Sequence, residues 1–121
     1  MAKIILIVED NALNMRLFNG LLQSAGYETI QSVDGSDALE IADDRRPDLI
    51  IMDIQLPGRS GLDLTRELKA NEELKHIPVV AVTAFAMLGD EGKILEAGCD
   101  AYIPKPISIP TFLETVAKYL S

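Results

Sequence analysis

The sequence predicts a doubly wound, three-layer α/β sandwich in which five helices cover both faces of a five-stranded parallel sheet. Two observations predict this fold. Short apolar runs rich in β-branched residues recur along the 121 residues, and a helical pattern follows each of them. The runs do not alternate polar with apolar residues, as expected of parallel strands that are buried on both faces. Because the connections are short, the β–α units are expected to wind onto both sides of one sheet.

Four of the five expected strands lead directly to polar residues. In chain order, the strands are expected over residues 3–8, 28–33, 49–52, 79–82 and 101–103. The first precedes Glu9 and Asp10, and the third precedes Asp53. The fourth precedes Thr83, and the fifth leads to Lys105. Since ligands of open α/β sheets bind beyond the carboxyl ends of the strands, these five side chains are expected at one edge.

Helical patterns occupy the intervals between the strands. One-face apolar spacing predicts a first helix that ends at Gly26 and a last helix over Ile109–Leu120. A turn at residues 34–36 precedes the second helix, and Gly61 precedes the third. The fourth, around Met87–Ala97, is expected to be weak because it contains two glycines. The apolar residues that mark these helices are Leu17, Phe18, Leu21, Leu22, Ala25, Ala38, Leu39, Ile41, Ala42, Leu62, Leu64, Leu68, Ile109, Phe112, Leu113, Val116, Ala117 and Leu120.

Composition excludes several classes of protein. The chain is 48% hydrophobic and 25% charged, which is ordinary for a globular domain and argues against disorder. A net charge of -8 with only 11 scattered basic residues argues against nucleic-acid binding. No apolar segment is long enough for a signal peptide or a membrane span, and the lone Cys99 suits a reducing cytoplasm. We therefore expect one cytoplasmic domain over residues 1–121, without an output domain.

Asp53 has the strongest individual signal for chemistry, because a carboxylate that follows a buried strand has no evident structural purpose. A carboxylate can accept a phosphoryl group as an acyl phosphate. The negative charges of the two partners repel unless a hard cation such as Mg²⁺, or Mn²⁺ in its place, neutralises them. Asp10 is the expected second ligand of that cation, and the backbone carbonyl of Gln55 is a candidate third. Glu9 is expected to act through a metal-bound water.

Two further residues are expected to contact the phosphoryl group. Lys105 would pair with one phosphate oxygen, and the hydroxyl of Thr83 would donate to another. Each residue has a plainer interpretation when taken alone, since Glu9-Asp10 could cap a helix and Thr83 could simply end a strand. The Lys105-Pro106 bond could be cis, in a tight turn that aims the lysine at the site, or trans. Only the combination is specific.

These motifs, in this order, resemble the receiver domain of bacterial two-component response regulators over essentially the whole chain. The matching pieces are Glu9-Asp10, Met52-Asp53, Leu56-Pro57-Gly58 with Gly61, Thr83-Ala84, and Tyr102 with Lys105-Pro106. Longer stretches, among them IVEDNALNMRLF, MDIQLPG and HIPVVAVTAFAM, are similar to single-domain members of the family that control cell division and polarity.

The resemblance implies a flavodoxin-like fold with strand order 2-1-3-4-5. It also implies phosphorylation of Asp53 by a histidine kinase, with Mg²⁺ on Asp10, Asp53 and the Gln55 carbonyl. Thr83 and Tyr102 would form the switch that responds to the phosphate. Such a protein is not an enzyme beyond promoting its own phosphorylation and dephosphorylation.

The expected partners are other proteins. A histidine kinase, a phosphatase or a phosphotransfer protein would exchange the phosphoryl group, and a downstream protein would bind the fourth helix, fifth strand and fifth helix. We expect no nucleic acid and no membrane insertion, and we expect a partner kinase to recruit the protein to a cell pole. His76 precedes the fourth strand, away from the site, so the phosphoryl donor must be another protein. Cys99 is expected in the core.

Three alternative functions have parts of this pattern in common with a receiver. An aspartate-based phosphohydrolase of the haloacid dehalogenase type has a second Asp at the position of Gln55. A flavin or dinucleotide binder has a Gly- or Ser/Thr-rich loop after the first strand, where this chain has Glu9-Asp10-Asn11. A receiver-like scaffold that is never phosphorylated would have the same fold, and this third alternative stays open.

Overall fold

The computed structural model describes residues 2–56, 60–83 and 91–120. Pro57, Gly58, Ala84 and Met87, which were named above, lie outside these residues. Strands and helices alternate along the chain. They are β1 (Ile4–Val8), α1 (Ala12–Ser24), β2 (Glu28–Ser32), α2 (Ala38–Arg45), β3 (Leu49–Asp53), α3 (Gly61–Ala70), β4 (Val79–Thr83), α4 (Glu91–Glu96), β5 (Ala101–Pro104) and α5 (Ile109–Leu120).

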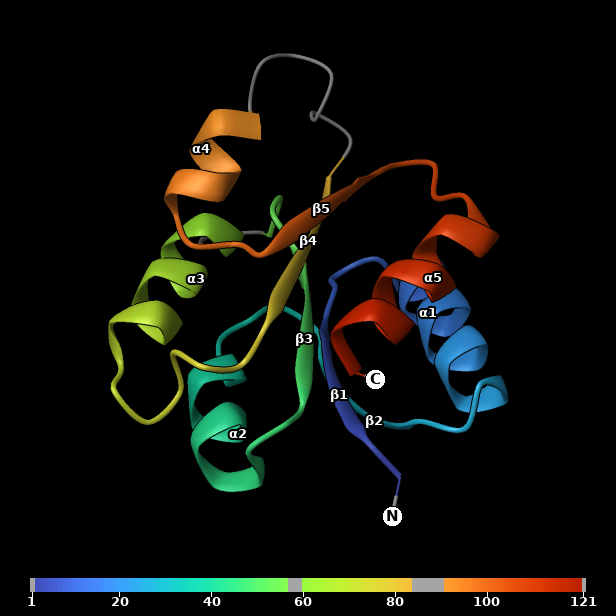
Figure 1. Cartoon of the computed structure of the whole chain (residues 1–121), viewed down its shortest axis with the longest axis horizontal. Coiled ribbons are helices and arrows are strands. Elements are labelled where there is room, and N and C mark those ends of the chain that lie inside the picture. Colours follow the sequence, from blue (N-terminus) through green and yellow to red (C-terminus); the bar gives the residue numbers. More distant parts are fainter. Residues whose placement is uncertain (1, 57–59, 84–90, 121) are drawn as a thin grey trace.

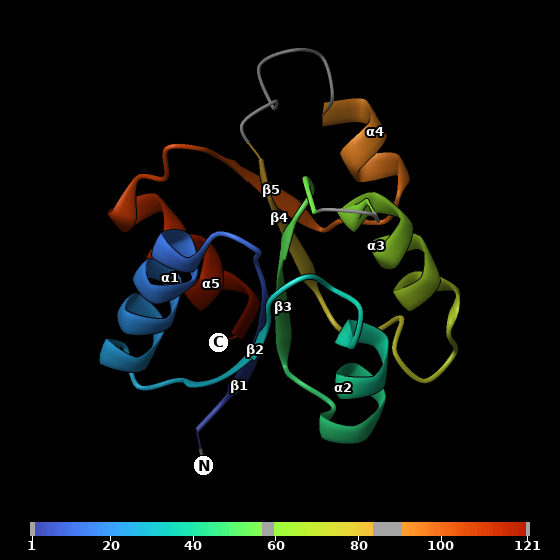
Figure 2. The same cartoon turned by 180° about the vertical axis from the view of Figure 1, so that it is seen from behind.

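The five strands form one parallel sheet in the order β2-β1-β3-β4-β5, which confirms the expected fold class. Helices α1 and α5 cover one face, and α2, α3 and α4 cover the other (Figure 1). The view from behind shows the same two layers (Figure 2). This arrangement brings the carboxyl ends of β1, β3, β4 and β5 to one edge of the sheet, where their polar residues meet.

Two apolar cores lie on the two faces of the sheet. Alternate residues of each strand point to opposite faces, so β1 sends Leu6 and Val8 to the core under α2, α3 and α4. Ile5 and Ile7 of the same strand enter the core under α1 and α5. Every residue of β3 and β4 is buried, which explains why their sequences do not alternate.

Local hydrogen bonds set the ends of the first helix. The Asn11 side chain accepts hydrogen bonds from two backbone N–H groups of the first turn of α1, so Asn11, rather than Glu9 or Asp10, is its N-cap. At the other end, Gly26 has a positive φ of 95°, and its N–H donates to the Gln23 carbonyl. Gly26 therefore ends α1 as the sequence predicts.

Other boundaries follow equally local signals. Asp34 accepts a hydrogen bond from the Ser36 N–H and Gly35 has φ of 81°, which forms the predicted turn before α2. Ser60 caps α3 through its side chain. Strands β3 and β4 each extend one residue beyond the expected apolar run, so Asp53 and Thr83 are themselves strand residues.

Some of the apolar residues that mark the helices are exposed. Leu17 of α1 is 40% exposed and Ile109 of α5 is 45% exposed, and Ala117 is also exposed. The apolar stripe of α5 is wider than the surface the sheet can cover, so only Phe112 and Val116 are fully buried. These exposed apolar side chains therefore do not belong to the core, and packing of the core does not explain why they are apolar.

The helices of the described part of the chain are short or amphipathic. Among these residues, no helix is both long and apolar enough to cross a lipid bilayer. Helix α4, which was expected to be weak, is helical over Glu91–Glu96 in the part that the structure describes.

Candidate functional site

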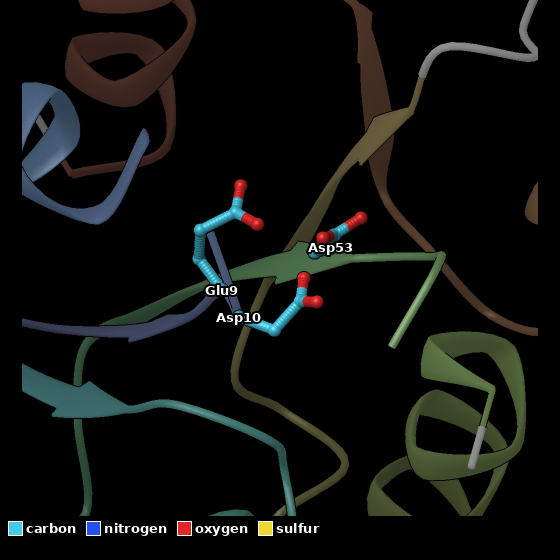
Figure 3. A group of neighbouring side chains, drawn as sticks. All are labelled: Glu9, Asp10 and Asp53. Carbon is cyan, nitrogen blue, oxygen red and sulfur yellow. The ribbon is translucent and has the colours of Figure 1, made fainter. Parts of the chain in front are cut away.

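Three carboxylates gather at the carboxyl ends of β1 and β3. Glu9 and Asp10 follow β1, and Asp53 ends β3, the strand paired with β1. One oxygen from each of these carboxylates lies within 4.8 Å of the other two (Figure 3). Glu9 is 1% exposed and Asp53 2%, whereas Asp10 is exposed. The site is thus an acidic cluster with two buried members and one member open to solvent.

Lys105 supplies the positive charge beside these acids. Its Nζ lies 3.2 Å from Oε1 of Glu9 and 3.6 Å from Oδ2 of Asp53. The Lys105 backbone N–H donates to the carbonyl of Thr83, which fixes the lysine at the end of β4. The Lys105-Pro106 peptide bond is cis, the first of the two alternatives raised by the sequence. One lysine faces two buried carboxylates, so the cluster remains short of positive charge.

The state of Glu9 reflects that shortage. Burial, together with a hydrogen bond and repulsion from Asp53, raises the pKa of Glu9 to about 7, although Lys105 and the Asn11 N–H oppose the rise. Oε2 of Glu9 accepts the Asn11 N–H at 3.3 Å. Oε1, although close to Lys105, has no aligned hydrogen-bond donor among the described residues. A buried, incompletely satisfied carboxylate oxygen in an all-oxygen cluster fits a hard divalent cation.

Asp53 is held in a fixed orientation by its own loop. Its Oδ1 accepts the N–H of Gln55 at 3.0 Å, and its Oδ2 faces Lys105. The two oxygens therefore have different partners: Oδ1 is bound to the backbone, and Oδ2 faces the Lys105 ammonium group. Gln55 is exposed and lies in the same loop, and the role of its carbonyl as a metal ligand stays a prediction.

Thr83 and Tyr102 belong to the neighbouring strands β4 and β5. Thr83 is 1% exposed at the end of β4, and it pairs in register with Pro104 of β5. Tyr102 pairs with Ala81 and is half-buried against the core under α2, α3 and α4. The two residues lie on adjacent strands, and their role as a switch stays a prediction.

The residues set aside by the sequence lie away from this edge. His76 is exposed and precedes β4, at the opposite end of the strand from Thr83. Cys99 is 5% exposed and packs near Thr65, with its Sγ 3.8 Å from the Thr65 hydroxyl. Burial raises the pKa of the Cys99 thiol, so this group is suited to packing, as predicted, and not to redox chemistry.

Two features of the site were not found from the sequence. One is the ion pair between Lys105 and Glu9, since Lys105 was assigned only to a future phosphate. The other is the close packing of Gly61 against the backbone of Asp53. The sequence shows that Gly61 follows Asp53 by eight residues. No local pattern indicates their contact, because it depends on how the start of α3 packs against the end of β3.

Comparison with known proteins agrees with this geometry. The family model of the response regulator receiver domain matches residues 5–117. The polar-differentiation response regulator DivK of Brucella anthropi is 59% identical over 120 residues, which cover 99% of this chain and 98% of the relative. DivK of Brucella ovis is equally similar, with the same identity and coverage.

Solved structures show the same fold. The receiver domain of the sensor histidine kinase PA1611 from Pseudomonas aeruginosa has a TM-score of 0.91 and 34% identity over 98% of both chains, and it contains a magnesium ion in its active-site cleft. The chemotaxis response regulator CheY4 of Vibrio cholerae has a TM-score of 0.91 and 25% identity, covering 98% of this chain and 99% of CheY4. With a family model that spans nearly its full length and relatives this similar, the chain belongs to the response regulator receiver domain family.

Proposed function

We propose that this protein is a single-domain response regulator that accepts a phosphoryl group on Asp53 and signals through phosphorylation-dependent protein binding. The observation that carries the proposal is the cluster of Glu9, Asp10 and Asp53 within 4.8 Å, with Lys105 at 3.2 and 3.6 Å from two of its members. Buried charge that is not fully compensated is costly and clusters at functional sites, and a metal-assisted phosphoryl acceptor needs such a cluster of carboxylates.

A divalent cation is the expected cofactor, with Mg²⁺ preferred over Mn²⁺. Asp10, Asp53 and the Gln55 carbonyl would hold it directly, and Glu9 would hold it through a water molecule. When bound, the cation neutralises charge between the acceptor and the incoming phosphate. The magnesium ion in the similar PA1611 receiver supports this choice, as does Oε1 of Glu9, to which no described residue donates a hydrogen bond.

The residues of the chain have separate parts in the transfer. An Asp53 oxygen forms the new P–O bond while the bond between phosphorus and the donor nitrogen of a kinase histidine breaks. Lys105 pairs with a phosphate oxygen, for which its present partners Glu9 and Asp53 already orient it. Thr83 donates its hydroxyl to another phosphate oxygen. Both contacts strengthen as negative charge gathers on the phosphoryl group.

The donor protein must approach the edge of the sheet where Asp53 lies. Next to that edge is a surface pocket of about 440 Å³, lined by Lys105 together with Leu17 and Ile107. Leu13, one turn before Leu17 on α1, is 75% exposed. We infer that a helical surface of the phosphoryl donor covers these apolar side chains.

Leu13→Asp should slow transfer from a cognate kinase at least about tenfold and leave labelling by acetyl phosphate unchanged; equal slowing of both reactions would refute this placement.

The phosphate would become a signal through Thr83 and Tyr102. Phosphorylation adds about −1.5 to −2 charges at one point. Movement of Thr83 toward the phosphate would free volume that Tyr102 can fill, and the face formed by α4, β5 and α5 would present the change to a downstream protein. A nearly complete switch needs roughly 5.5 kcal/mol of differential stabilisation. A cation, a lysine and a hydroxyl acting on the same phosphate can supply that amount together.

The biological setting proposed here rests on the relatives. Proteins 59% identical over nearly the whole chain are named polar-differentiation regulators. We therefore propose a part in cell division and polarity, with recruitment to a cell pole by a partner kinase. Fluorescent fusion of the protein in cells that lack the kinase would test the recruitment, and unchanged polar foci would contradict it.

Intact-protein mass after incubation with acetyl phosphate tests the central proposal. A single phosphoryl adduct is expected that requires Mg²⁺ and disappears in Asp53→Asn. Adduct formation that persists in Asp53→Asn would refute the assignment of the acceptor. If acetyl phosphate gives no adduct, transfer from a panel of histidine kinases decides between a kinase-restricted receiver and a scaffold that is never phosphorylated. Gln55, at the position of the second acid of a haloacid dehalogenase-type enzyme, leaves that alternative without its general acid.

A further inference from the structure

Gly61 lies so close to the end of β3, the strand that carries Asp53, that a side chain would not fit at this position. A Cβ added at this residue would lie 2.2 Å from the carbonyl oxygen of Asp53 and 2.9 Å from the Cα of Ile54. The backbone φ of Gly61 is not positive, and the residue begins α3 as an ordinary helical residue. What the position requires is therefore space and not an unusual conformation.

Polar contacts hold the start of α3 in this place. The Gly61 N–H donates to the carbonyl of Ile54 at 3.1 Å, which folds the helix back onto the end of β3. The fully buried hydroxyl of Thr65 donates to the Gly61 carbonyl at 2.8 Å. The side chain of Ser60 caps the same turn by accepting the N–H of Leu62. The first turn of α3 and the peptide after Asp53 thus form one packed unit.

This unit carries the two groups on which acceptance of the phosphoryl group depends. The Asp53 carboxylate is tied through Oδ1 to the N–H of Gln55, so any displacement of the peptide between them turns the carboxylate as well. We propose that Gly61 is a positioning residue for the acceptor: its missing side chain lets α3 press against the Asp53 backbone and so fixes the carboxylate and the Gln55 carbonyl in register. This inference rests on the proposed phosphorylation of Asp53.

The expected size of the effect follows from the contact. A Cβ is essentially never found under 3.0 Å from a heavy atom outside its own residue and that residue's two chain neighbours, so Gly61→Ala must widen the gap from 2.2 to at least 3.0 Å, that is by 0.8 Å or more. The opposing atoms are backbone and cannot rotate away. Since a displacement near 1 Å costs on the order of 100-fold in rate, phosphorylation of Gly61→Ala should slow by about that factor.

The chain offers a matched control in Gly20, which is inside α1 with nothing within 4 Å of its added Cβ. Gly20→Ala should label at the wild-type rate and, because alanine favours helix, stabilise the fold. Gly61→Ala is therefore made both alone and in the Gly20→Ala background, so that it can be studied as a folded protein. The rate of adduct formation with acetyl phosphate is followed by intact mass at increasing Mg²⁺, beside the urea unfolding curve of each variant.

A positioning role predicts a pattern that mere destabilisation does not produce. In folded Gly61→Ala the limiting rate stays about 100-fold low at saturating Mg²⁺, and the apparent Mg²⁺ affinity also falls. A limiting rate equal to that of Gly20→Ala would overturn the inference. If Gly61→Ala does not fold in either background, Thr65→Val carries the test, because it replaces the hydroxyl that donates to the Gly61 carbonyl, and that lies 3.8 Å from the Cys99 Sγ, with a methyl group. Roughly threefold slower labelling is then expected, and an unchanged rate would overturn the inference. Failure of the wild type to label with acetyl phosphate and with every histidine kinase of the panel would refute the proposed function, which is a distinct result.

Discussion

Replacement of Glu9 by glutamine should change the pH dependence of stability in the metal-free protein. Burial and the neighbouring Asp53 raise the pKa of Glu9 from 4.5 to about 7. Between these two pH values the folded protein keeps a proton that the unfolded chain has already released. The stability contributed by that proton is fully present below pH 4.5 and is lost as pH rises through about 7.

Across the interval between the two pKa values, 4.5 and about 7, the free energy of unfolding falls by about 3 kcal/mol. Glutamine resembles the protonated carboxyl and does not titrate. The variant should therefore be close to the wild type in stability at pH 4.5 and more stable by up to about 3 kcal/mol at pH 8. Lys105, at 3.2 Å from Glu9, already tempers the penalty, because its attraction opposes the rise in pKa.

Urea unfolding followed by far-UV circular dichroism, in EDTA, measures the difference directly. The chain contains no tryptophan, so this signal is preferable to fluorescence. Glu114→Gln, which replaces an exposed carboxylate of α5, is the control and should show no comparable change between the two pH values. A difference between wild type and Glu9→Gln that is the same at pH 4.5 and pH 8 would refute the reasoning. Excess Mg²⁺ at pH 8 should stabilise the wild type more than the variant, because only the wild type presents a third carboxylate to the cation.

Three other substitutions test Lys105, the proposed switch residue Tyr102 and the apolar core. Lys105→Ala should slow phosphorylation of Asp53 by about 100-fold through loss of a phosphate contact, measured by the rate of mass increase with acetyl phosphate; a wild-type rate would contradict the role. Tyr102→Ala should still be phosphorylated but should bind a downstream partner equally with and without phosphate, as measured by calorimetry; a wild type without phosphate preference would defeat this prediction. Phe112→Ala should lower the free energy of unfolding by roughly 3–5 kcal/mol, because the buried ring stacks on Phe18 at 5.2 Å. A loss under about 1 kcal/mol in urea unfolding would show that the core refills the space.

The sequence alone was sufficient to predict the fold and the edge of the sheet at which the polar residues gather. Apolar runs buried on both faces, with helical patterns between them, define a parallel sheet wherever they occur, because both signals are local. The rule that ligands bind at the carboxyl ends of such strands then brings Glu9, Asp10, Asp53, Thr83 and Lys105 to one edge. The structure confirms the strand order and brings the three acids within 4.8 Å.

Tertiary structure alone decided how these residues act on one another. The raised pKa of Glu9 depends on burial and on Asp53, which lies 44 residues further along the chain. The exposure of Leu17 depends on how much of the surface of α1 the sheet covers, and the spacing of apolar residues along the sequence does not reveal that area. The contact of Gly61 with the Asp53 carbonyl depends on the return path of α3. Patterns along a chain reveal which face of an element is apolar, but distances and desolvation arise only when separate elements pack together.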